Sequence, residues 1–237
     1  MADGDEVLRG LNALTQFLVG DTTMSQTLQR IIDLAAEAVP PAAYTGLTML
    51  VDDKVTTSVF SDPDVPEIDQ AQYEAGNGPC LDAFRHSKIY EIPSTARDAT
   101  WPEFSRAALD HGIRSTLSMP LAAGGSALGA LNFYSETEHG FSEPDRQAAK
   151  AFATQTAVVL MNAQAYWEAR TFGENMEQAM RSRATIEQAK GILMAQSKVS
   201  PDDAFEMLRM ASQRENRKLR DVAQGLVNRH GGGEDTA

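Results

Sequence analysis

The spacing of apolar residues changes several times along the first 165 positions. Apolar residues recur at helical spacing over Val7–Val19 and again over Met24–Val39, where Pro40 and Pro41 end the helix. Alternating or β-branched runs predict five strands, over Tyr44–Val51, Val55–Phe60, Ile89–Ile92, Ser115–Ala122 and Leu128–Tyr134. This order predicts an α+β domain, an antiparallel sheet with its terminal helices packed on one face.

The segments between these strands predict short helices and loops. Leu81–His86 is expected to be helical, and Thr100 with Glu103 resembles a capping box that starts a helix ending near Asp110. Ser61–Glu67 contains two prolines and several acids, so we expect a loop there. Ser142 and Asp145 predict the start of another long helix, with Pro144 in its first turn.

That long helix carries a seam of residues at alternating spacings of four and three. The seam comprises Phe152, Thr156, Val159, Ala163 and Tyr166. It is disturbed near Gly173 and resumes with Phe172, Met176, Ala179, Arg183 and Ile186. This pattern predicts a homodimeric coiled coil, with Phe152, Val159, Ala163, Tyr166 and Met176 in the seam. The alternative is a single helix that packs on its own domain.

The C-terminal segment predicts a small three-helix bundle. Its helices are expected over Ser182–Gln196, from the Ser200 cap onward, and over Lys218–Val227. Gly191 lies inside the first helix, where it predicts the close approach of another helix. We therefore expect a domain at 1–165, a helical linker at 166–181, the bundle at 182–230 and a disordered tail at 231–237.

Composition excludes several classes of protein. The single cysteine, Cys80, rules out an intramolecular disulfide and a cysteine-rich zinc site, and the four histidines lack ligand spacing, so no metal is expected. The N-terminus is acidic rather than signal-like, and no apolar run has the length of a membrane span. These features predict a soluble cytoplasmic protein without membrane contact.

The net charge of −12 argues at first against a nucleic-acid partner. The charge is unevenly distributed, however, because residues 1–170 carry a net −12 and residues 171–230 carry +2. Five basic residues with one opposing acid, Glu215, lie between Arg209 and Arg220. Such a cluster suits a phosphate backbone, although a solvated charged surface explains it equally well.

No catalytic constellation is evident in the sequence. The turn glycines match no nucleotide-binding loop, and no triad or paired carboxylates can be aligned, so an enzyme is not expected. Cys80 precedes a predicted helix, which would lower the pKa of its thiol, but a small buried hydrophobe is the simpler interpretation. Trp101 either lines a ligand pocket or packs a helix on the sheet.

Several blocks of residues occur in the order found in GAF domains. They are Gly78–Ala83, Trp101–Phe104, Gly112–Ser115, Met119–Leu121, Gly129–Tyr134 and Phe141–Glu143. Over roughly residues 7–165 the chain resembles that family. The resemblance implies a sheet of about six antiparallel strands with a pocket on one face. It also implies that the domain either binds an unidentified small molecule in this pocket or serves as a dimerisation module. No cofactor is known. The pocket candidates are Cys80, Tyr90, Trp101 and Phe104.

The C-terminal segment resembles an ANTAR domain over about residues 172–228. The matching blocks are Arg183–Met194, Ser200–Ser212 and Asn216–Ala223. The resemblance implies binding of RNA hairpins and transcription antitermination. The residues expected to contact RNA are Arg183, Lys190, Arg209, Ser212, Arg214, Asn216, Arg217, Lys218 and Arg220. Family positions interpreted as core are Ala189, Gly191, Ala204, Phe205 and Ala223.

Together these features predict a dimeric, signal-responsive regulator. It would bind hairpins in nascent transcripts through the bundle and act on the transcription machinery indirectly. The alternative is a small-molecule sensor whose C-terminal helices mediate protein interaction or dimerisation without RNA.

Overall fold

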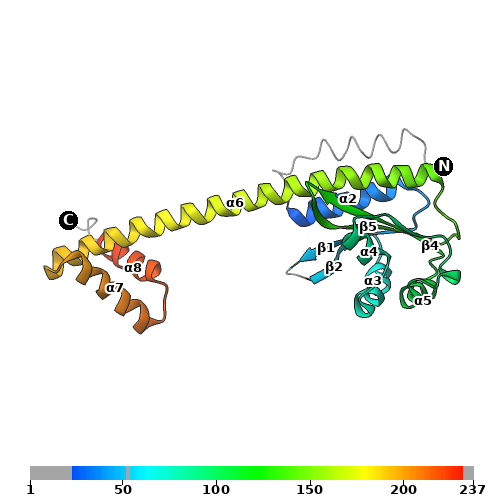
Figure 1. The fold of residues 1–237 in the computed structure, drawn as a ribbon. Coiled ribbons are helices and arrows are strands. Elements are labelled where there is room, and N and C mark those ends of the chain that lie inside the picture. The colour runs from blue at the N-terminus through cyan, green and yellow to red at the C-terminus, as the bar shows by residue number, and fades with distance from the viewer. Residues whose placement is uncertain (1–22, 52–53, 232–237) are drawn as a thin grey trace. The chain divides into compact units, whose positions relative to one another are not determined.

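The computed structural model describes residues 23–51 and 54–231 (Figure 1). The expected helix over Val7–Val19 and the expected tail after Gly231 lie outside the described residues. The chain forms two compact units, Met1–Trp167 and Glu168–Ala237.

The first unit contains most of the secondary structure. Its elements are α2 (Met24–Ala38), β1 (Tyr44–Val51), β2 (Lys54–Phe60), α3 (Asp64–Ala75), α4 (Pro79–His86), β3 (Tyr90–Ile92), the 3-10 helix η2 (Thr95–Arg97), α5 (Pro102–Asp110), β4 (Ser115–Ala123), β5 (Ser126–Ser135) and the first part of α6 (Glu143–Ser197). The strands form one antiparallel sheet in the order β2-β1-β5-β4-β3. The predicted α+β class is confirmed, and the described sheet has five strands rather than about six.

Two local expectations in this unit are wrong. The segment expected to be a loop contains the start of α3, which begins at Asp64 after the Asp62 carboxylate accepts a hydrogen bond from the Asp64 N–H (3.0 Å). The expected capping box at Thr100 does not form. Instead, the Asp98 carboxylate accepts hydrogen bonds from the backbone N–H groups of Thr100 and Trp101 and from the Ser105 hydroxyl.

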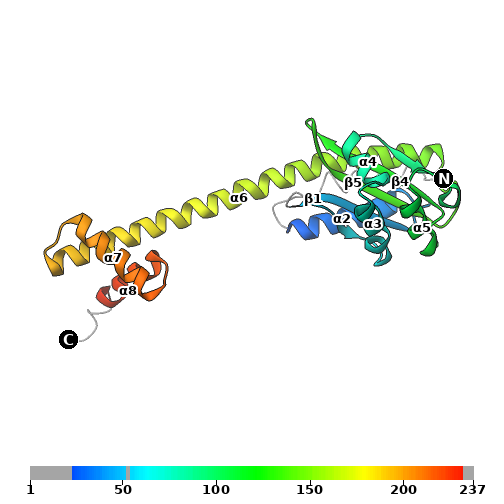
Figure 2. The same ribbon diagram turned by 60° about the horizontal axis from the view of Figure 1, so that its bottom comes forward.

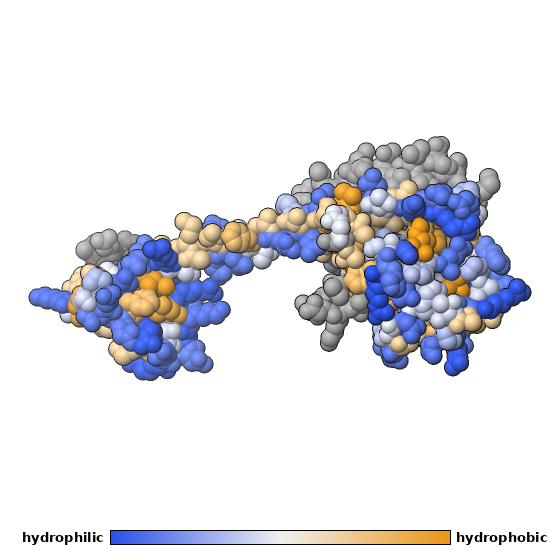
Figure 3. Space-filling view, viewed as in Figure 1, coloured by the Kyte–Doolittle hydropathy of each residue, from blue (hydrophilic) through white to orange (hydrophobic). Residues whose placement is uncertain are grey.

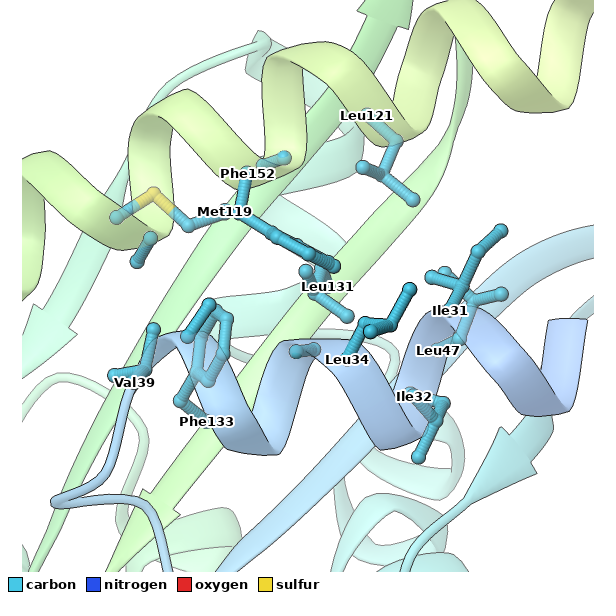
Figure 4. Packing of buried hydrophobic residues seen from close by; sticks show 14 of the residues in the cluster. Ile31, Ile32, Leu34, Val39, Leu47, Met119, Leu121, Leu131, Phe133 and Phe152 are labelled. Atoms are coloured by element: carbon cyan, nitrogen blue, oxygen red, sulfur yellow. The ribbon is translucent and has the colours of Figure 1, made fainter. Parts of the chain in front are cut away.

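The helices cover the two faces of the sheet in different ways. Helices α2 and α6 lie over one face, whereas α3, α4 and α5 lie on the other (Figure 1; Figure 2). The alternating residues of β1, β4 and β5 that point toward α2 and α6 are apolar and form the main core, which includes Leu47, Leu117, Met119, Leu131 and Phe133. Figure 4 shows Leu47, Met119, Leu131 and Phe133 of this core packed between α2 and α6.

This core contains part of the predicted dimer seam. Phe152 is fully buried in the main core, where it packs with side chains of the sheet and of α2 (Figure 4). Ala163 is also fully buried. The alternative interpretation therefore holds for these two residues, which are buried within their own unit. Tyr166 and Met176 remain exposed.

The second unit is built from the end of α6, α7 (Pro201–Glu215) and α8 (Leu219–Gly231). Ser200 caps α7 as predicted, because its hydroxyl accepts a hydrogen bond from the Asp203 N–H (3.2 Å). The small core has four buried residues, Ala189, Leu208, Val222 and Ala223. Its small side chains allow the helices to approach closely.

Two of the expected core positions in this unit are wrong. A Cβ atom at Gly191 would meet open space, so this glycine does not mark a close helix contact. Phe205 is 40% exposed rather than buried. Ala189, Ala204 and Ala223 are buried as expected.

Phe152→Ala should lower the free energy of unfolding by about 3–5 kcal/mol, because it removes a fully buried ring from a packed core. Chemical denaturation followed by tryptophan fluorescence would measure the loss, with Lys150→Ala on the exposed side of α6 as the control. A loss that grows on dilution of the protein would instead place Phe152 in a dimer interface.

Candidate nucleic-acid interface and the polar face of the sheet

The turn between α7 and α8 holds the centre of the basic cluster. Asn216 adopts the left-handed conformation (φ 50°) that ends α7, and its N–H donates to the Gln213 carbonyl oxygen at 3.3 Å. The Ser212 hydroxyl donates to the Arg217 carbonyl oxygen (2.5 Å), and the Arg217 guanidinium donates to the Asp221 carbonyl oxygen (3.3 Å). These three predicted RNA contacts therefore shape the turn that presents the others.

Several of the predicted cations are paired with acids close by in the sequence. Arg209 forms a forked pair with Glu206, Lys190 lies 3.0 Å from Glu187, and Arg220 lies 3.5 Å from Asp221. Glu215 pairs with both Arg217 (3.1 Å) and Arg214 (3.8 Å). Exposed pairs of this kind contribute about 0–1 kcal/mol, so a phosphate group can replace the acid. Lys190 is the least accessible of these cations, since 17% of its side chain is exposed.

Two predicted residues keep an uncompensated charge. Arg183 and Lys218 are exposed, and neither side chain forms an ion pair or hydrogen bond with another described residue. Lys218 directly precedes α8, beside the turn built by Ser212 and Asn216. It is therefore the position in the cluster best prepared to bind an anion.

A groove in the second unit adds a cation that the sequence analysis missed. The groove has a volume of about 610 Å³. Its lining residues are Leu193, Met207, Leu208, Met210, Ala211, Arg214, Glu215, Val222, Leu226 and Arg229. Arg229 lies about one helical turn after Leu226 and about two turns after Val222, so the three residues share one side of α8. This spacing is the sequence signal that could have placed Arg229 on the apolar side of α8, and so in the same groove as Arg214.

The sheet face under α3 and α4 is buried but polar. Thr48, Ser118 and Asn132 lie on this face and are almost inaccessible to solvent. The carboxylate of Asp69, on α3, is the centre of the buried network. It accepts hydrogen bonds from the side chains of Thr57 (2.6 Å), Gln72 (2.7 Å) and Tyr134 (2.7 Å).

Burial governs the protonation of this network. Desolvation raises the pKa of the Asp69 carboxyl to about 6, although the three hydrogen bonds oppose the shift. Desolvation, with the Asp69 charge added, raises the pKa of the Cys80 thiol to about 12. Cys80 is therefore a buried neutral thiol despite its place in the first turn of α4, as the simpler interpretation of the sequence held.

Among the other expected pocket residues, Tyr90 packs against the cluster of Cys80, while Trp101 and Phe104 belong to a neighbouring cluster. Tyr90 contacts the clusters of both Cys80 and Trp101, and the Tyr90 and Trp101 rings meet edge to face at 5.5 Å. Trp101 and Phe104 are buried in one cluster, and the Trp101 indole N–H donates to the Asp82 carboxylate (3.1 Å). The structure thus brings these four residues together, with Trp101 and Phe104 as packing residues.

Comparison with protein families identifies both units. A family model described as GAF domain matches residues 21–161, which is more than half of the chain. The chain belongs to the GAF domain family. A second family model, described as ANTAR domain, matches residues 174–227. The protein therefore has a GAF domain followed by an ANTAR domain, and the turn, the basic cluster and the groove all lie in the ANTAR domain.

Solved structures with the same fold cover the GAF domain. The GAF domain of a phosphoenolpyruvate-protein phosphotransferase from Coxiella burnetii is 18% identical, with a TM-score of 0.52 over 69% of this chain and 98% of that chain. The free methionine-R-sulfoxide reductase from Neisseria meningitidis, in complex with its substrate, is 16% identical, with a TM-score of 0.53 over 68% and 89% of the two chains. At these identities the likeness shows the fold alone. A search of curated proteins found no match.

None of the described helices combines the length and apolar character needed to cross a bilayer. Within the described part of the chain, no group of three His, Cys, Asp or Glu side chains could hold a metal ion.

The raised pKa of Asp69 predicts a pH-dependent stability of the GAF domain. Because the folded state holds this proton more tightly than the unfolded chain, the contribution is largest below pH 4 and is lost as the pH rises through about 6. A pKa rise from 3.8 to about 6 corresponds to roughly 3 kcal/mol. Asp69→Asn should therefore become more stable relative to the wild type between pH 4 and pH 7. Urea unfolding at a series of pH values would measure this difference, and a constant difference would contradict the assignment.

Proposed function

We propose that this protein is a signal-responsive, RNA-binding regulator that binds hairpins in nascent transcripts and promotes transcription antitermination. The observation that carries the proposal is the coincidence of the ANTAR match with the basic turn between α7 and α8. Hairpin loops present splayed bases and phosphates, which suit Lys, Arg, Ser and Asn donors. Such a protein is proposed to act in the cytoplasm and to affect the transcription machinery through the RNA.

The proposed contacts have two distinct tasks. Ser212, Asn216 and Arg217 order the turn, which supports a fixed presentation of the neighbouring charges. Arg183 and Lys218 supply uncompensated positive charge. The other four cations would replace their ion pair with a nearby acid by a contact with phosphate; they are Lys190, Arg209, Arg214 and Arg220. The acidic GAF domain accounts for the overall charge and does not argue against RNA at the ANTAR domain.

The GAF domain is proposed to receive the signal. The polar face of its sheet contains two buried oxygen atoms, Asn132 Oδ1 and Thr116 Oγ1, that have no hydrogen-bond partner in the structure. Such atoms favour a small polar ligand or water at this face. Cys80, Tyr90, Trp101 and Phe104 are the proposed neighbours of that ligand.

A regulatory role fits the GAF domain better than catalysis. Free methionine-R-sulfoxide reductases share its fold, and reduction of a sulfoxide by a thiol requires an accessible, reactive cysteine. Cys80 is the only cysteine, and it is 1% exposed with a pKa raised to about 12. Both properties oppose thiolate chemistry.

The exposed side of α6 is proposed to form a homodimer. Tyr166, Phe172, Met176 and Met180 are each at least 40% exposed. Figure 3 shows apolar side chains exposed along this helix. An exposed apolar stripe on a helix is typical of a partner helix, and a second copy supplies an identical stripe. A signal in the GAF domain, where α6 packs on the sheet, can then alter how the two copies of α6 associate.

The RNA proposal predicts a specific salt dependence. The full chain should retain members of a stem–loop RNA pool with a randomised loop, and the logarithm of the affinity should fall linearly with the logarithm of salt concentration. Lys218→Ala and Arg183→Ala should each weaken binding and reduce the slope by about 1. Lys190→Ala should also weaken binding. Filter binding at several salt concentrations would measure these effects.

Lys150→Ala, an exposed change on the GAF part of α6, is the matched control and should bind as the wild type does. If no hairpin is retained at low salt, the RNA proposal is wrong. A partner that survives RNase treatment of a lysate would then favour the alternative, a sensor with a protein-interaction module.

The dimer proposal predicts that Met176→Glu lowers the association of the full chain by at least roughly tenfold, because it places a charge in an apolar contact. Gln178→Glu adds the same charge at a neighbouring exposed position and should leave association unchanged. Sedimentation equilibrium would compare the two variants. Equal association of Met176→Glu and wild type would refute the α6 interface.

A further inference from the structure

The groove of the ANTAR domain joins an apolar floor to two arginines. Leu208 and Val222 form its buried floor, and Met210 is 54% exposed at its edge. Arg214 and Arg229 line the same groove from α7 and α8. Figure 3 shows an apolar area bordered by hydrophilic side chains on this unit. A ligand for this groove therefore needs an apolar surface next to negative charge.

The charges of the groove are available to such a ligand. The Arg214 side chain is 81% exposed, and its ion pair with Glu215 is long, at 3.8 Å. Arg229 forms no ion pair with a described residue. Glu215 is also paired with Arg217, at 3.1 Å. The groove is thus continuous with the basic turn through Arg214, Glu215 and Arg217.

We propose that this groove receives one unstacked nucleobase of a bound RNA, whose flanking phosphates lie on Arg214 and Arg229. The inference rests on the proposed function, because it assigns a new contact to the same RNA. A base is flat and apolar on its faces, and methionine sulfur makes favourable contacts with aromatic rings. Arginine suits this role better than lysine, because its planar guanidinium group both stacks on bases and pairs with phosphates through two hydrogen bonds.

The size of the apolar surface favours a base over a protein helix. An amphipathic helix docks through several apolar anchors spaced three or four residues apart. Met210 is the one large apolar residue of this groove that is strongly exposed, since the other large apolar lining residues are buried or half-buried. The volume of about 610 Å³ lies within the usual range for small-ligand sites.

The experiment places 2-aminopurine at each loop position in turn of a hairpin selected from the randomised pool. With the full wild-type chain, we expect one loop position to change its fluorescence on binding. Met210→Glu should abolish that change and weaken affinity at least tenfold, whereas Met210→Leu should preserve both. Circular dichroism and thermal melting would check that each variant folds.

Phe205→Ala is the matched control, because Phe205 is an exposed apolar residue of α7 that does not line the groove. It should keep the fluorescence change. The opposite result, with Phe205→Ala losing the change and Met210→Glu keeping it, would place the base on Phe205 and overturn the proposal. Wild-type affinity of Met210→Glu for the hairpin, with loss of a protein partner, would identify the groove as a protein site.

These outcomes separate the two proposals. If the wild-type chain binds no hairpin, the proposed function itself fails. If it binds hairpins with the predicted salt dependence, but no loop base responds or Met210→Glu has no effect, only the assignment of the groove fails.

Discussion

The packing of α6 is the interaction on which both units depend. Phe152, Ala157 and Leu160 of this helix complete the core over the apolar face of the sheet, while Ala189, Ile186 and Leu193 of the same helix belong to the core of the ANTAR domain. Each core would lose one of its walls without α6, because neither the sheet nor the α7–α8 pair can bury its apolar side alone. Any change that alters the packing of α6 in the GAF domain therefore acts on an element that the ANTAR domain also requires.

The sheet divides the GAF domain into two chemically different interiors. The side under α2 and α6 is filled by Leu, Met and Phe side chains, and the side under α3 and α4 contains Thr, Ser, Asn and Tyr around Asp69. A strand alternates its side chains between the two faces, so one sequence pattern produces both interiors. Hydrogen bonds satisfy much of the polar interior, while Asn132 Oδ1 and Thr116 Oγ1 on this side have no hydrogen-bond partner in the structure.

The ANTAR domain uses its polar residues partly for structure. Ser212, Asn216 and Arg217 hold the turn, and the cations around it are either paired over short sequence distances or left uncompensated. Exposed pairs cost little to break, so most of the cluster can serve a phosphate backbone. Arg229 extends this positive surface to the groove, where Met210 supplies apolar contact. Charge and apolar surface therefore meet in one small bundle.

The sequence by itself determined the elements with strong periodicity or clear caps, such as β1, the Ser200 cap and the buried alanines Ala189 and Ala204. It also determined the contrast between an acidic first domain and a basic turn. It missed α3, because buried polar residues such as Asp69 and Gln72 break the apolar stripe that reveals a helix. Only the tertiary structure decided that Phe152 is core, that Phe205 is exposed and that Arg229 and Arg214 line one groove. Periodicity reports which side of an element is apolar, whereas the partner of that side is set by contacts between residues distant in the chain.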